Sequence, residues 1–76
     1  MNAVDRVVSW IMERNPTLTE PPSAGDDLIE RRLIDSLAFV DFLYFLEEIT
    51  GAEIDMATVD VDDFRSVDAI RRRFLE

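Results

Sequence analysis

One stretch of this 76-residue chain, residues 33–51, limits its possible folds more than any other. Between Asp35 and Gly51 there is no proline or glycine, and large apolar residues fill most positions. Asp35 belongs to the residue types that cap helix N-termini, and Gly51 supplies the left-handed conformation that commonly ends a helix. The sequence therefore predicts a helix over residues 36–50 that is covered along most of its length.

The side chains of this helix fall into two stripes when they are placed at about 100° per residue. One stripe is apolar and predicted to be core: Phe39, Phe42, Leu43, Leu46 and Ile49. The other begins at Ser36 and mixes apolar with acidic residues: Val40, Tyr44 and Glu48, flanked by Asp41 and Glu47. The mixture suits a surface that a partner covers. A core helix with a wide buried face fits the periodicity as well, and both interpretations stay open.

Three further helices are predicted from apolar spacing and capping residues. Residues 3–14 carry apolar side chains at i, i+3, i+4 and i+7, and Pro16 ends that helix. Residues 57–63 alternate valine with acids, which also fits a short strand, but a lone strand has no partner here, so a short helix or irregular turn is preferred. Residues 67–75 form the last helix. The fold class is all-α, a small four-helix bundle with a short third helix, in a single domain over residues 1–76.

A long connection precedes the central helix. It contains three prolines and a glycine, and apolar residues that are expected to anchor it to the core: Leu18, Leu28, Ile29 and Leu33. Asp26 and Asp27 are expected to cap a helical turn. Trp10 lies off the apolar stripe of the first helix, so we expect it to cover a helix edge or line a loop contact.

Composition and charge exclude several functions. The net charge is −9, and residues 35–63 hold nine acids and no base, which favours basic protein partners and argues against nucleic acid. Without cysteine or histidine the chain has no disulfide and no zinc site, and the spacing of acids fits no calcium loop, so no metal is expected. No secretion signal or membrane span is visible, and the expected location is the cytoplasm.

Ser36 is the one residue that stands out chemically. A serine nucleophile needs a base, and without histidine no catalytic set is present, so the protein is not expected to be an enzyme. A hydroxyl at a helix N-terminus is a suitable place for an attached phosphate. Assistance to Asp35 in capping explains the serine equally well.

Asp35-Ser36-Leu37 at the start of the second helix, followed by Leu46-Glu47-Glu48, resembles the acyl carrier protein family. The resemblance covers nearly the whole chain, including the anchored loop and the helix after Ser66-Val67. It implies that Ser36 receives 4′-phosphopantetheine from coenzyme A, through a separate magnesium-dependent transferase, and that cargo is carried as a thioester. Asp35 matches the acid that assists this modification. The helix face that partner enzymes recognise matches Leu37, Val40, Asp41, Tyr44, Glu47 and Glu48.

Differences from the commonest members narrow the expected cargo. Leu33-Ile34 precede the motif and Ala38 follows it, which is closer to discrete carriers of amino acids, D-alanine or short acyl units. Bulky rings on the central helix predict little room for a long acyl chain. We expect a monomeric carrier with no membrane contact, served by a phosphopantetheinyl transferase, a loading enzyme and a downstream synthase, transferase or tailoring enzyme. The alternative is an acidic helical adaptor of the same fold that is never modified.

Overall fold

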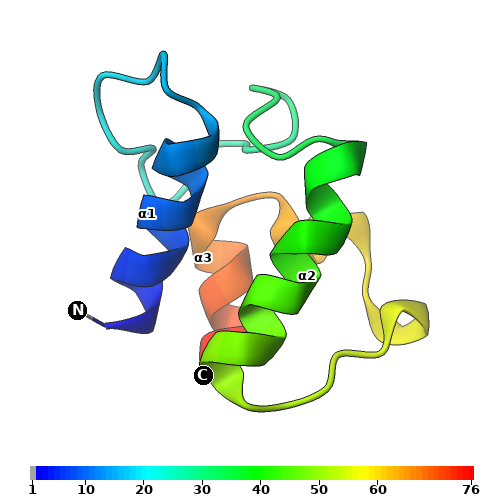
Figure 1. The fold of residues 1–76 in the computed structure, drawn as a ribbon. Helices are drawn as coiled ribbons and strands as arrows, with labels where there is room; N and C mark the ends of the chain where they lie inside the picture. The colour runs from blue at the N-terminus through cyan, green and yellow to red at the C-terminus, as the bar shows by residue number, and fades with distance from the viewer. Residues whose placement is uncertain (1) are drawn as a thin grey trace.

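A computed structural model describes residues 2–76, and every regular element in this part of the chain is helical (Figure 1). Its helices and helical turns follow in the order α1 (Ala3–Arg14), α2 (Ser36–Thr50), η1 (Met56–Thr58), η2 (Val61–Phe64), α3 (Val67–Ile70) and η3 (Arg71–Leu75). The segments η1 and η2 are 3-10 turns, and η3 continues α3 with π-helical hydrogen bonding. Both α3 and η3 pack against α1, and η3 also packs against α2, so the last helix joins the first two. No strand occurs within residues 2–76.

Both ends of α2 are capped as the sequence predicts. The Asp35 carboxylate accepts hydrogen bonds from the backbone N–H groups of Leu37 at 3.0 Å and Ala38 at 2.8 Å. Gly51 adopts the left-handed conformation with φ of 71°, and its N–H bonds to the Glu47 carbonyl. The predicted bounds of helices 3–14, 36–50 and 67–75 are confirmed, the last with a π-helical final turn.

The predicted helix over residues 57–63 is wrong. The chain forms the two 3-10 turns η1 and η2 instead, with residues 59 and 60 extended between them. Asp55 caps the first turn, and Asp60 and Asp63 form a capping box that starts the second. Aspartate favours such local bonds over a helix interior. The domain therefore has three helices plus 3-10 turns in place of four helices.

The core is aromatic at its centre, and Trp10 belongs to it. The Trp10 ring is 8% exposed and stacks on Phe42 and Phe45 with centroid distances of 4.9 and 5.8 Å. The expectation that Trp10 covers a helix edge is therefore wrong. Its outer side is covered by Arg14, whose guanidinium carbon lies 4.2 Å from the ring centroid. Trp10 lies off the apolar stripe of α1, and this cation–π contact covers the side of its ring that does not pack on α2.

The long connection is anchored through Leu28, which is fully buried. Its carbonyl accepts from the N–H groups of Leu33 at 2.8 Å and Ile34 at 3.3 Å, and its own N–H donates to the Arg65 carbonyl at 2.7 Å. Asp27 caps this turn, as predicted, because its carboxylate accepts hydrogen bonds from the backbone N–H groups of Ile29 and Glu30. The chain is therefore fixed in place just before α2 begins. Across residues 2–76, no helix is long and apolar enough to cross a membrane.

Candidate functional site

Ser36 is the first residue of α2, and its side chain is exposed. Both capping bonds go to Asp35, and within residues 2–76 no hydrogen bond involves the Ser36 hydroxyl. The interpretation in which Ser36 helps to cap the helix is thus not what the structure shows. The hydroxyl is free to react, and it lies at the positive end of the helix dipole.

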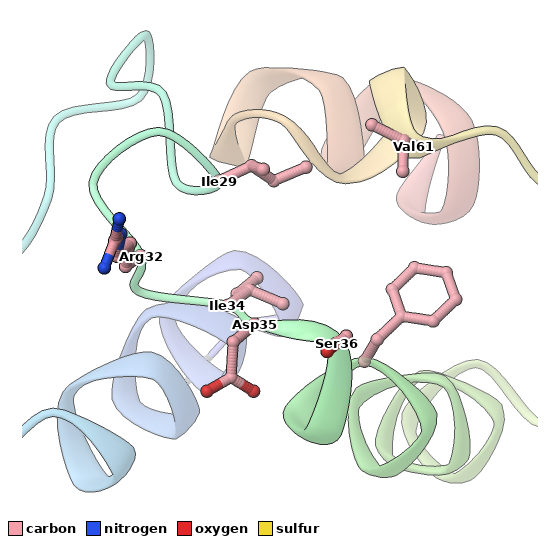
Figure 2. Close-up of a pocket in the computed structure, with 7 residues that line it drawn as sticks. Ile29, Arg32, Ile34, Asp35, Ser36 and Val61 are labelled. Atoms are coloured by element: carbon pink, nitrogen blue, oxygen red, sulfur yellow. The ribbon is translucent and has the colours of Figure 1, made fainter.

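An apolar groove of about 350 Å³ opens beside Ser36. This volume is at the lower end of the range of about 300–1,000 Å³ that is usual for small-molecule sites. Most of its lining is apolar: Ile29, Ile34, Phe39 and Val61, with Arg32, Asp35 and Ser36 completing it. Figure 2 shows Ile29 and Val61 on one side of the groove and Ile34 and Ser36 on the other, with the Asp35 carboxylate pointing away from Ile29 and Val61. A group attached to Ser36 therefore has an apolar surface within reach.

Aromatic rings fill the core next to this groove. Phe39, a groove residue, packs edge to face on the buried Phe64 with centroids 4.8 Å apart. Phe64 in turn contacts Phe42 at 5.7 Å and Phe74 at 5.1 Å. Lengthening the groove into the core would separate these rings, whose packing contributes beyond their buried area.

Arg65 joins the two segments that form one side of the groove. Its guanidinium lies 3.1 Å from the Asp27 carboxylate, beside the Ile29 turn, and 2.7 Å from the Asp62 carboxylate, next to Val61. The backbone N–H of Glu30 and the Arg65 side chain both hold the pKa of Asp27 below its ordinary value. The same two carboxylates raise the pKa of Arg65. This charge network fixes the turn that carries Ile29 relative to η2, which carries Val61.

The outer face of α2 carries most of the residues that the sequence assigned to docking. The outer face of α2 consists of five exposed side chains: Leu37, Val40, Asp41, Tyr44 and Glu48. Leu37 and Tyr44 are 86% and 67% exposed, which is unusual for large apolar or aromatic residues. Asp41 lies 3.7 Å from the guanidinium of Arg14. The structure thus brings these five together on one surface of the helix.

Glu47 does not belong to that surface. It is half-buried, and its carboxylate accepts a hydrogen bond from the backbone N–H of Ile54 at 2.9 Å. This bond ties the end of α2 to the chain that leads to η1. Glu47 therefore has a structural role that periodicity did not indicate, because a bond to a backbone group seven residues away leaves no pattern in the sequence.

Sequence reasoning missed two features of the site. Val61 lines the groove and is about half exposed, although its alternation with acids indicated no part in the site. The available signal for this part of the site was an apolar residue within the most acidic segment of the chain. Arg32 lines the groove with a positive φ of 60°. No residue type at that position indicates a left-handed backbone, so no signal existed for it.

Comparison of the chain with protein-family models, with curated proteins and with solved structures found no match.

Proposed function

We propose that the protein is a discrete carrier that holds an acyl or aminoacyl group as a thioester on a 4′-phosphopantetheine arm attached to Ser36. The observation that carries the proposal is the free, exposed hydroxyl of Ser36 at the N-terminus of α2, beside an apolar groove. The all-α fold and the acidic outer face of α2 support it further. The protein has no catalytic role of its own in this proposal.

The residues present fit such an arm. In the attachment, the Ser36 oxygen forms a bond to one phosphorus of the coenzyme A diphosphate, adenosine 3′,5′-diphosphate leaves, and the hydroxyl proton passes to a base of the transferase. The attached phosphodiester would lie at the positive end of the α2 dipole, which favours an anion. The arm supplies the thiol that the chain lacks. Both capping bonds use one oxygen of Asp35, Oδ1, so Oδ2 is left to assist the magnesium-dependent transferase.

The outer face of α2 is the proposed surface for partner enzymes. It offers the apolar side chains of Leu37, Val40 and Tyr44 among the acids Asp41 and Glu48. Interfaces combine such an apolar centre with a charged rim that speeds association with a surface of opposite charge. A transferase, a loading enzyme and a downstream synthase, transferase or tailoring enzyme would each present a basic rim and an apolar contact. The proposed location of these encounters is the cytoplasm.

An unmodified adaptor is the second candidate, because the exposed apolar residues of the outer face of α2 do not depend on an arm. Intact mass separates the two. The protein is incubated with coenzyme A, magnesium and a broad-specificity phosphopantetheinyl transferase. A single phosphopantetheine increment that Ser36→Ala abolishes, and that the control Ser23→Ala retains, supports the carrier. An unmodified wild-type chain that is folded by circular dichroism contradicts it and favours the adaptor.

A further inference from the structure

Arg32 is a cation in the groove wall without an acidic partner. Within residues 2–76 no carboxylate oxygen lies within 4 Å of its guanidinium, whereas the neighbouring Arg31 lies 2.7 Å from Asp26. The only acid that lines the same groove is Asp35, and its Oδ1 accepts the two bonds that cap α2. The positive charge of Arg32 is therefore available to a ligand.

The backbone of Arg32 is held firmly at this place. Its N–H donates to the Ile29 carbonyl at 3.0 Å, and the next N–H, of Leu33, donates to the Leu28 carbonyl at 2.8 Å. This pattern ends the preceding turn with a left-handed residue, a position that usually takes glycine. Because Leu28 is fully buried, the turn is anchored in the core. In Figure 2 Arg32 lies on the far side of Ile34 from Ser36, so the groove has the serine toward one end and the arginine toward the other.

The surrounding charges make Arg32 distinctive. The next basic residue along the chain is Arg65, which is engaged by Asp27 and Asp62. On the other side of Asp35, Arg14 lies beside Asp41. Arg32 thus supplies the positive charge of a lining whose other members are mostly apolar. A guanidinium presents paired donors that match a carboxylate or a phosphate.

We propose that Arg32 binds an oxyanion presented from Ser36 and so determines what the groove accepts. This proposal rests on the carrier function. Two sources have the required chemistry: the phosphodiester of the arm, and a carboxylate at the far end of a short acyl cargo whose carbon chain lies on Ile29, Ile34 and Val61. With the phosphodiester as ligand, Arg32 positions the arm, and with the cargo carboxylate as ligand it is a specificity residue that favours an anionic cargo over a neutral one of equal length.

The test compares three loaded forms of the full chain. The transferase attaches the arm from coenzyme A, from butyryl-coenzyme A or from succinyl-coenzyme A, and intact mass verifies each product. Proton–nitrogen NMR then follows the Nε–H of Arg32 and the backbone amides of Ile29 and Ile34. The variant is Arg32→Gln, and Arg31→Gln is the matched control, because it removes the same charge one residue away without touching the groove lining.

Each outcome is decisive. A downfield shift of the Arg32 Nε–H on attachment of the arm identifies the phosphodiester as the ligand. A shift that appears with the succinyl form and is missing from the butyryl form identifies the cargo carboxylate. Either supports the proposal if Arg32→Gln abolishes the matching amide shifts and Arg31→Gln keeps them. Correct masses with an unchanged Arg32 signal in all three forms overturn the proposal and leave the carrier function standing. A wild-type chain that accepts no arm overturns both.

Discussion

The carboxylate of Glu47 accepts a hydrogen bond from the backbone N–H of Ile54 at 2.9 Å, whereas the adjacent Glu48 is exposed. Two neighbouring glutamates of α2 therefore have different roles. We expect Glu47→Ala to lower the free energy of unfolding by about 1–2 kcal/mol, because it leaves a half-buried N–H without its partner. Glu48→Ala is the control and should change it by less than about 0.5 kcal/mol. Urea unfolding monitored by circular dichroism measures both, and equal losses would contradict the assignment.

The charges on the outer face of α2 should control the rate of encounter with partner enzymes. We expect the double variant Asp41→Lys, Glu48→Lys to reduce the second-order rate constant of modification by the transferase about tenfold at low salt, and to flatten its salt dependence. The control, Glu13→Lys with Glu20→Lys, makes the same change of charge at exposed positions outside α2. If both pairs slow the reaction alike, net charge explains the effect and the outer face of α2 has no special role.

The Asp27 carboxylate should make stability depend on pH in the acid range. Its pKa is lower in the folded chain than its ordinary value of 3.8, because the Glu30 N–H and the Arg65 side chain favour the charged form. The unfolded state therefore binds the proton first, and the stabilisation is present above about pH 4 and lost as the pH falls through the folded pKa. We expect the stability difference between wild type and Asp27→Asn to be constant from about pH 5 to 7 and to shrink below pH 4.

The measurement is urea unfolding of both proteins at each pH. Glu20→Gln is the matched control, since it removes one carboxylate at an exposed position of the same connection. If the difference in the free energy of unfolding between wild type and Asp27→Asn is unchanged down to the lowest pH, the charge of Asp27 does not contribute to stability.

The left-handed backbone of Arg32 predicts a gain in stability on substitution. Arg32→Gly should raise the free energy of unfolding by about 0.5–1 kcal/mol, because glycine adopts φ of 60° without a Cβ clash. Arg31→Gly should lower it, since Arg31 is not among the residues with positive φ. Thermal unfolding of the two variants makes the comparison. A loss of stability in both would show that the Arg32 side chain itself stabilises the fold.

Features encoded by neighbouring residues were predictable from the sequence. The bounds of α2 followed from Asp35 and Gly51, because a cap needs only the chain within one helical turn. The helical period placed Ser36 and most of the outer face of α2 on one stripe, but it left open whether that stripe is buried or exposed. The position of Leu28 as an anchor also followed, since it is an apolar residue in a polar connection.

Features that depend on distant contacts were not predictable. Trp10 is buried because it stacks on Phe42 and Phe45 of α2, which the pattern of the first helix does not reveal. The two 3-10 turns replace a helix because Asp55, Asp60 and Asp63 each accept a hydrogen bond from a different nearby backbone N–H group. The groove beside Ser36 is formed by residues from a loop, a helix and a 3-10 turn, so no single segment reveals it.

The cap of α2 leaves the hydroxyl oxygen of Ser36 out of every hydrogen bond that residues 2–76 form. Attachment of a group to that oxygen therefore removes no interaction that stabilises the helix. We expect the backbone conformation to be the same in the unmodified and the modified protein. A partner enzyme that must tell them apart receives no signal from a change of fold. In the proposed carrier function, a partner enzyme therefore recognises the loaded form by contacts with the attached group itself, at Ser36 and along the groove beside it.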